Sequence, residues 1–240
     1  MRAIIAGYGQ LGKAVKEVFS DYHDIDHYDL QDGTPPSGQL AVAAPYDVLL
    51  VCFPYSEGFV DQVKRYKERF GTKAVIIFST VPIGTTRQIK GAVHSPIEGK
   101  HPDLAKSIEL AKRWFGGSNN VAYDFLIRAT DLYVLPEPEM TEFLKLRSTA
   151  RYGVNIEFAR YEKAVCDAIG MNYAMVRKFD EDYNQLYLAL GLPQYQRYIL
   201  DPPQGNLGGH CLVDNAKLLE AQFPSVFLKE IYREKEGDTA

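Results

Sequence analysis

The residues with the clearest chemical potential lie near the C-terminus, in the stretch QGNLGGHCLVDN from Gln204 to Asn215. Three glycines, Gly205, Gly208 and Gly209, lie close to the pair His210-Cys211 in this stretch. A buried structural cysteine does not need bare backbone around it, whereas a nucleophile must be reached by its substrate. The other cysteines, Cys52 and Cys166, fall in an apolar run and in a helical pattern, where thiols are usually buried and inert. We therefore predict that Cys211 is the reactive thiol.

A second group of polar residues lies on a predicted helix. Glu142, Lys145 and Thr149 are spaced i, i+3 and i+7, which places them on one helix face. A lysine beside a reacting oxygen can stabilise a developing alkoxide, although a solvated surface lysine shows the same pattern. Thr80 ends an apolar run of strand length, where ligands bind in α/β sheets, although an ordinary turn residue or N-cap would fit equally well.

The N-terminal stretch GYGQLG has the spacing G-x-G-x-x-G and lies between a predicted strand and a predicted helix. Gly7 permits a tight turn, Gly9 lets the backbone approach a pyrophosphate, and Gly12 allows close packing of helix on strand. Asp29 ends the next strand, 17 residues after Gly12, and a carboxylate there favours NAD over NADP. A glycine turn without a ligand is the weaker alternative. The expected cofactor contacts are Gly7, Tyr8, Gly9, Gln10, Leu11, Gly12, Asp29, Phe53, Pro54, Ser79 and Thr80.

Strand-like and helix-like patterns alternate over residues 1–135, which predicts an α/β fold with a Rossmann-like, doubly wound parallel sheet. Continuous apolar runs such as DVLLVCF and KAVIIFS are typical of strands covered on both faces. The strands are expected at 2–6, 23–30, 47–53, 73–79, 92–94, 113–115 and 132–135, and the helices at 10–20, 57–70, 103–112 and 121–128.

The pattern changes at the sequence PEPE, Pro136 to Glu139, and only helices are predicted beyond it. We expect a smaller all-helical domain, residues 136–240, which carries the lysine and cysteine motifs. Its first two helices are expected at 139–169 and 173–190. A loop that includes Cys211 is expected to reach Val213, followed by helices at 213–221 and from Ser225.

Five short motifs follow one another along nearly the whole chain. They are Gly7–Gly12, Ser79-Thr80-Val81-Pro82 followed by Gly84-Thr85-Thr86, Gly116-Gly117, Glu142-Phe143-Leu144-Lys145, and Gly208–Asp214. In type and order they resemble the motifs of the UDP-glucose/GDP-mannose dehydrogenase family.

The resemblance implies a four-electron oxidation, in which a primary alcohol on a sugar nucleotide becomes a carboxylate and two NAD are reduced. It implies that Cys211 forms a thiohemiacetal and then a thioester, and that Lys145 stabilises the alkoxide. Thr80 and Glu98 would hold or activate the hydrolytic water. Asp214 and Thr149 complete the implied catalytic set, and the implied substrate contacts are Glu142, Lys145, Gly208, Gly209 and His210.

The sequence departs from the family pattern in four places. Thr149 stands where the family has asparagine, and Glu98 lies one residue late in Ser95-Pro96-Ile97-Glu98-Gly99, which leaves its role with water open. The aspartate after the cysteine is Asp214, at plus three, with Asn215 in the register position. The chain ends about where the family's C-terminal sugar-nucleotide-binding domain would start, which is expected to weaken nucleotide-sugar binding or change the substrate.

Three functions therefore stay open. The first is oxidation of a sugar nucleotide or a smaller sugar-like alcohol by the cysteine mechanism. The second is a two-electron 3-hydroxyacid dehydrogenase, which would use the helix lysine but not Cys211. The third is a non-catalytic NAD-binding protein whose site is degenerate or completed by a partner.

Composition limits the possible partners. The chain has 27 basic and 31 acidic residues and no strongly basic run, which argues against nucleic acid. No apolar run is long enough for a membrane helix, and the N-terminal apolar run is too short for a signal peptide. Three distant cysteines do not suggest a disulfide framework, and no metal site is predicted. We expect a cytoplasmic protein that binds a small molecule.

The oligomeric state is expected to be a homodimer. The helical pattern from Glu139 resembles the helix on which family members dimerise. Tyr152, Ile156, Tyr161 and Val165 give this helix apolar surface, although such residues are more often core.

Overall fold

The computed structural model describes residues 1–29, 45–99, 102–203 and 210–233. The chain forms two compact units, Met1–Leu146 and Arg147–Ala240, and each is described by itself below.

Unit 1 is built on a seven-stranded sheet with the order β2-β1-β3-β4-β5-β6-β7. Neighbouring strands are parallel except β5 and β6, which pair antiparallel at His94 and Gly116. The predicted Rossmann-like α/β class is confirmed, while the antiparallel step was not predicted. The strands are β1 (Arg2–Ala6), β2 (Asp24–Tyr28), β3 (Val48–Val51), β4 (Ala74–Ile77), β5 (Ala92–His94), β6 (Arg113–Gly116) and β7 (Leu132–Leu135).

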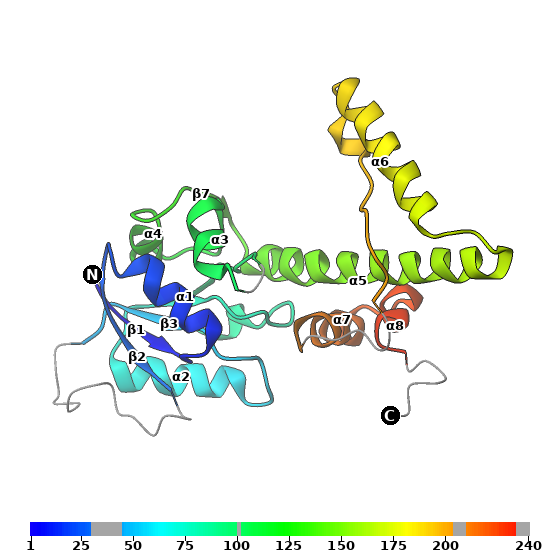
Figure 1. The fold of residues 1–240 in the computed structure, drawn as a ribbon. Coiled ribbons are helices and arrows are strands. Elements are labelled where there is room, and N and C mark those ends of the chain that lie inside the picture. Colours follow the sequence, from blue (N-terminus) through cyan, green and yellow to red (C-terminus); the bar gives the residue numbers. More distant parts are fainter. Residues whose placement is uncertain (30–44, 100–101, 204–209, 234–240) are drawn as a thin grey trace. The chain divides into compact units, whose positions relative to one another are not determined.

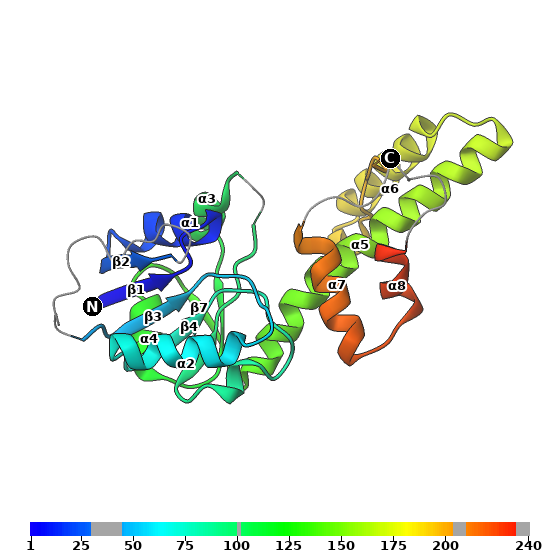
Figure 2. The ribbon, with the colours of Figure 1, turned by 90° about the horizontal axis from the view of Figure 1, so that it is seen from below.

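Helices cover both faces of the sheet, as Figures 1 and 2 show for α1 (Gln10–Phe19) and α2 (Phe59–Phe70). On one face, α1, α3 (Leu104–Leu110) and α4 (Asn120–Leu126) bury apolar side chains against alternate strand residues such as Ile5. On the other face, α2 packs against the intervening residues, which include Ile4. The continuous apolar runs thus arise because each strand has a buried residue on both sides. A short 3-10 helix, η1 (Thr86–Gln88), follows β4.

The long helix α5 (Pro138–Ile169) begins in unit 1 and continues into unit 2. Its first turns belong with the sheet because Thr141, Glu142 and Leu146 are fully buried there. The division between the compact units thus falls at Leu146, inside α5, whereas the change in sequence pattern falls at Pro136.

Unit 2 is helical over the residues that the structure describes. The remainder of α5 is followed by α6 (Ala174–Ala189), η2 (Pro193–Tyr195), α7 (His210–Gln222) and α8 (Val226–Tyr232). Gly153 on α5 admits α8 closely, since a Cβ at Gly153 would lie 2.9 Å from a carbon of Ile231. None of the helices among these residues is both long and apolar enough to cross a bilayer.

Candidate functional site

The strand order defines where a ligand is expected to bind. The chain passes from β1 to β2 on one side and continues through β3 to β7 on the other, so the order reverses between β1 and β3. Open α/β sheets bind ligands at the carboxyl ends of the strands at such a point. Gly7 follows β1 there, and Phe53 and Pro54 follow β3 shortly after its last residue.

The glycine-rich turn is as tight as its sequence predicts. Gly7 has φ +91°, and a Cβ on it would lie 2.7 Å from the backbone nitrogen of Phe53. A Cβ on Gly12 would lie 2.1 Å from the carbonyl oxygen of Gly7, so helix α1 can approach only with glycine here. Nothing lies within 4 Å of a Cβ built on Gly9, the N-cap, which has no side-chain capping bond. The turn therefore leaves open space beside uncapped helix N–H groups, where a phosphate is stabilised.

Asp29 closes this turn from the end of β2. Its carboxylate accepts a 2.5 Å hydrogen bond from the backbone N–H of Tyr8. The Tyr8 ring stacks on the imidazole of His27, with 3.7 Å between ring centroids. Asp29 thus reaches the glycine turn, as the spacing predicts, and one of its contacts there is to the protein backbone. Among the other expected cofactor contacts, Gln10 and Pro54 are exposed, and Leu11 is half-buried.

A chain of hydrogen bonds joins this edge of the sheet to helix α5. The Ser79 hydroxyl donates to the carbonyl of Phe53 at 2.6 Å, and the Ser79 carbonyl lies 3.2 Å from Nε2 of His94. Because a carbonyl only accepts, Nε2 carries the imidazole proton, and Nδ1 lies 2.8 Å from the Thr141 hydroxyl, which is also 2.8 Å from the Pro138 carbonyl. Burial lowers the pKa of His94 to about 3, so the ring is neutral. Thr80, next to Ser79, is half-buried.

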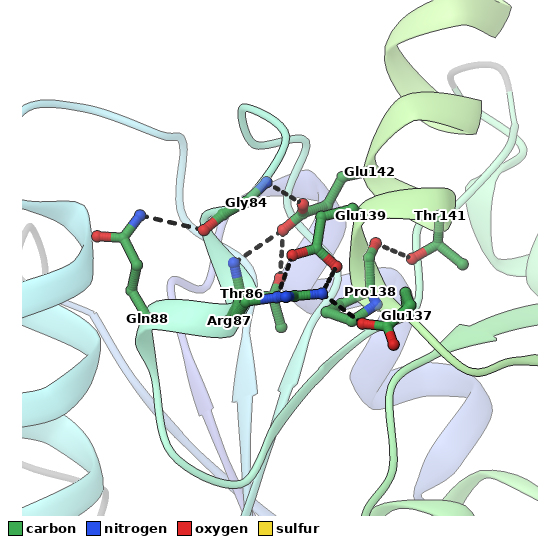
Figure 3. Close-up of polar contacts among 9 residues, drawn as sticks. All are labelled: Gly84, Thr86, Arg87, Gln88, Glu137, Pro138, Glu139, Thr141 and Glu142. Carbon is green, nitrogen blue, oxygen red and sulfur yellow. Dashed lines mark hydrogen bonds and ion pairs between the residues drawn. The ribbon is translucent and has the colours of Figure 1, made fainter.

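Glu142 anchors α5 to the loop after β4, as Figure 3 shows. Its carboxylate accepts from the N–H of Gly84 at 2.6 Å and from the N–H and hydroxyl of Thr86 at 2.8 and 2.6 Å. Burial raises the pKa of Glu142, and these hydrogen bonds act in the opposite direction. The side chain, expected to contact substrate, is fully buried, with protein donors on both carboxylate oxygens.

Arg87 strengthens the same junction from the surface. Its guanidinium forms ion pairs with Glu137 and Glu139, which flank the first residue of α5 (Figure 3). Exposed pairs of this kind add little stability, so the buried Glu142 contacts carry most of the attachment.

Lys145 and Glu98 are brought together from different elements. One turn after Glu142 on α5, Lys145 donates a 2.7 Å hydrogen bond to the carbonyl of Ile97. The Lys145 Nζ also lies 3.5 Å from Oε1 of Glu98. The lysine side chain is 16% exposed and the glutamate side chain 49%, so the pair lies at the surface of unit 1 with the lysine largely enclosed. Two predicted catalytic residues are thus neighbours.

Arg113, at the start of β6, also belongs to this region, although the sequence pattern does not predict it. It is 2% exposed and donates to the carbonyl of Pro96 at 2.7 Å. Burial lowers its pKa to about 10, which Glu98 opposes, so the guanidinium stays charged at neutral pH. The only sequence signal is a lone cation at the start of an apolar strand. His94, likewise not predicted, ends β5 just before the Ser95-Pro96 turn.

In unit 2, Thr149 pairs with a residue near the predicted nucleophile. The amide of Asn215 on α7 donates to the Thr149 hydroxyl at 3.2 Å, and Asn215 is 6% exposed. Asp214 is exposed. The helix α7 begins at His210, so Cys211 lies in its first turn and not in the expected loop, since the helical backbone begins directly after the glycine pair. Gly208 and Gly209 lie outside the described residues, as do the side chains of His210 and Cys211.

In the part of the chain that the structure describes, no group of three or more His, Cys, Asp or Glu side chains is arranged to hold a metal ion.

Comparison with known proteins places the fold. No protein-family model and no curated protein sequence matches the chain. Among solved structures, a UDP-D-ManNAc dehydrogenase from Pyrococcus horikoshii is similar with a TM-score of 0.78 at 18% identity. A UDP-glucose dehydrogenase from Pyrobaculum islandicum is similar with a TM-score of 0.73 at 17% identity. Each comparison covers 96% of this chain and 66% of the other, so the chain spans slightly less than two thirds of these proteins.

A third structure matches a larger share of its own length. The 3-hydroxyisobutyrate dehydrogenase of Mycobacterium tuberculosis is similar with a TM-score of 0.68 at 11% identity, over 96% of this chain and 90% of that one. At these identities the likeness establishes a shared fold. The chain therefore has the fold of the sugar-nucleotide and 3-hydroxyacid dehydrogenases, which supports the sequence resemblance at the level of structure.

Proposed function

We propose that this chain is an NAD-dependent oxidoreductase that oxidises a primary alcohol of a sugar nucleotide, or of a related sugar, to the carboxylate through a thioester on Cys211. The observation that carries the proposal is the pairing of Lys145 with Glu98, since these residues come from separate motifs and meet only through the fold. The similarity in fold to two UDP-sugar dehydrogenases supports it.

The glycine turn fits a dinucleotide. Its tight backbone at Gly7 and Gly12, the open space at Gly9 and the uncapped start of α1 are the features that a pyrophosphate requires. When bound, NAD supplies the hydride acceptor for each oxidation. Asp29 would then share its carboxylate between the Tyr8 N–H and the adenosine ribose, which favours NAD over NADP.

Lys145 is the proposed electrostatic catalyst. Its ammonium would donate to the substrate oxygen as that oxygen loses its proton, and the developing negative charge is stabilised by the fixed positive charge. The bond to Ile97 O holds the amino group in place, so little reorganisation is needed when the charge develops.

Cys211 is the proposed nucleophile. Its thiolate sulfur attacks the aldehyde carbon to give a thiohemiacetal, and loss of a second hydride leaves a thioester. The thiolate is the nucleophilic form of a cysteine. Water then cleaves the thioester to the carboxylic acid and the free thiol, so the whole sequence from the alcohol consumes one water and releases two hydrides, one to each of two NAD, and two protons.

Glu98 and Thr80 are proposed to hold and activate that water, with Glu98 as the base that takes its proton. Thr149 on α5 forms a neutral hydrogen-bonded pair with Asn215, which lies four residues after Cys211 on α7. Of the two polar residues after the cysteine, the burial of Asn215 and the exposure of Asp214 favour Asn215 for a role at the site.

The proposal is tested by replacing Cys211 with serine. The variant should bind NAD as the wild type does but form no carboxylate. The wild type, denatured during turnover, should show an acyl adduct on the peptide that contains Cys211. Full activity of the Cys211→Ser variant would exclude the cysteine mechanism.

A two-electron 3-hydroxyacid dehydrogenase is the second candidate, because a protein of that kind matches this fold over 90% of its length. It would use Lys145 but not Cys211, so the same serine variant separates the two functions. One hydride per substrate, independent of Cys211, is its signature.

Homodimerisation is also proposed. On α5, Tyr152, Tyr161 and Val165 are exposed, as the dimer hypothesis requires, whereas Ile156 is buried in the core. Light scattering coupled to size-exclusion chromatography would give the mass in solution, and a monomer at micromolar concentration would contradict the hypothesis.

A further inference from the structure

Residues 95–97, which follow β5, are held in place through their backbone carbonyl groups. The guanidinium of Arg113 donates to the carbonyl of Pro96 at 2.7 Å and reaches that of Ser95 at 3.5 Å. The carbonyl of the next residue, Ile97, accepts from Lys145 at 2.7 Å. Three consecutive carbonyls therefore face two cations, and Glu98 is the next residue along the chain.

Arg113 is placed for this one task. It is 2% exposed, it has no carboxylate within ion-pair distance among the described residues, and its Nε has no hydrogen-bond partner there. Its guanidinium lies 5.8 Å from the ring centroid of Phe78, the residue before Ser79. Arg113 thus contacts both the end of β4, which precedes Thr80, and the segment after β5, which precedes Glu98.

A buried arginine that is charged but has no carboxylate within ion-pair distance is costly to keep, even with Glu98 close enough to raise its pKa, and an apolar residue would fill the same space without a desolvation penalty. Both bonds come from Nη2, and the planar guanidinium fixes the directions of the two N–H groups on that nitrogen, whereas an ammonium group rotates about its stem. An arginine is explained at this position if its function is to fix the backbone of residues 95–98.

We propose that Arg113 is a positioning residue that sets the place of Glu98 beside Lys145 by gripping the carbonyls of Ser95 and Pro96. The inference deepens the proposed function, because the carboxylate so placed is the one assigned to the hydrolytic water. Arg113 itself touches neither substrate nor water.

The first test does not depend on activity. Lys145 is acetylated with a limiting amount of an N-hydroxysuccinimide ester, and the extent is read by peptide mass spectrometry in the wild type, Arg113→Met and Arg113→Lys. Release of the segment should raise the rate at Lys145 several-fold in both variants, relative to Lys13. The control, Arg128→Met, removes an exposed arginine and should leave the rate unchanged. Equal rates at Lys145 in the wild type and in folded Arg113→Lys would overturn the proposal.

The second test is a double-mutant cycle on turnover. Arg113→Lys should slow carboxylate release about tenfold, as expected when a charged hydrogen bond is lost, and should let the Cys211 acyl adduct accumulate. The KM for NAD should stay unchanged, because the glycine turn is untouched. In a Glu98→Gln background, Arg113→Lys should add nothing, since it acts through Glu98. Effects that multiply in the double variant would show that Arg113 acts elsewhere. If the wild type makes no carboxylate, the proposed function fails, and the acetylation result still decides the role of Arg113.

Discussion

The amino group of Lys145 lies 3.5 Å from a carboxylate oxygen of Glu98 and donates to the carbonyl of the residue before it. The two side chains come from α5 and from the segment after β5, which are distant in sequence and are joined by the burial of Thr141 and Glu142 against the sheet. The ammonium and the carboxylate that the proposed mechanism uses are thereby held close together by the fold of unit 1.

Replacement of Lys145 by methionine should lower kcat by about 10²–10³, the usual effect of removing one group that stabilises an oxyanion. NAD affinity should change little, because the glycine turn lies on other elements. The control is Lys163→Met, which removes an exposed lysine of the same helix that pairs with Asp167. Steady-state kinetics of both variants gives the two kcat values. An equally small decrease in kcat in both variants would mean that Lys145 has no role in the mechanism.

Alanine at Gly12 and alanine at Gly9 should have different effects, one on stability and the other on NAD binding. At Gly12 a Cβ would overlap the Gly7 carbonyl oxygen, so Gly12→Ala should lower the thermal midpoint strongly. At Gly9 the surrounding space is open and φ is −71°, so Gly9→Ala should fold normally. It should weaken NAD binding about tenfold or more, since the methyl group enters the space that the pyrophosphate would use. Calorimetry and NAD titration measure both effects, and unchanged NAD affinity in Gly9→Ala would place the cofactor elsewhere.

Acid should destabilise the protein partly through His94. Its pKa is lowered to about 3 in the folded chain by burial, against an ordinary value of 6.5. Between these values the unfolded chain binds a proton that the folded chain does not, so the free energy of unfolding falls as pH falls, by up to about 1.4 kcal/mol per pH unit. Above pH 6.5 the residue has no effect on the slope.

The variant His94→Gln isolates this contribution. It should be less stable than the wild type at pH 7, because bonds to Ser79 and Thr141 are lost, but its stability should fall less between pH 6.5 and 4.5. Urea unfolding at several pH values provides the comparison. Parallel pH profiles for the two proteins would mean that His94 is not the group that titrates.

Asn215 and Asp214 are distinguishable by substitution. Asn215→Ala removes the hydrogen bond to the Thr149 hydroxyl and should cost about 1–2 kcal/mol of stability as well as turnover. Asp214→Asn alters only an exposed side chain and should leave both unchanged. A loss of turnover confined to Asp214→Asn would restore the aspartate to the catalytic set.

Periodicity predicts this fold well because strands buried on both faces must be continuously apolar, as in Val48–Val51 and Ala74–Ile77. The glycine turn is predictable for the same reason, since it depends on local sterics at Gly7 and Gly12. The antiparallel pairing of β5 and β6 leaves no such local signal, because it depends on the path of the chain through α3.

The site was harder to predict where tertiary contacts decide the role of a residue. The helix spacing predicts that Glu142 shares a polar face with Lys145. It does not predict that N–H groups of Gly84 and Thr86 donate to the Glu142 carboxylate and enclose it. The role of Arg113 is not predictable from the sequence, because arginine is usually exposed and only the folded chain shows that it binds the carbonyl of Pro96. Cys211 falls in a helix because the helical backbone starts at His210, earlier than the apolar periodicity indicates.

The most direct test of the proposed function is the number of NADH molecules formed per substrate by the purified protein, across UDP- and GDP-sugars, free sugars and 3-hydroxyacids. We predict two NADH for each sugar nucleotide or sugar oxidised, because the cysteine-bound intermediate carries the substrate from the alcohol to the acid without release. One NADH per molecule of a 3-hydroxyacid would contradict this account and establish the two-electron reaction, and no NADH from any substrate would contradict the assignment of an oxidoreductase.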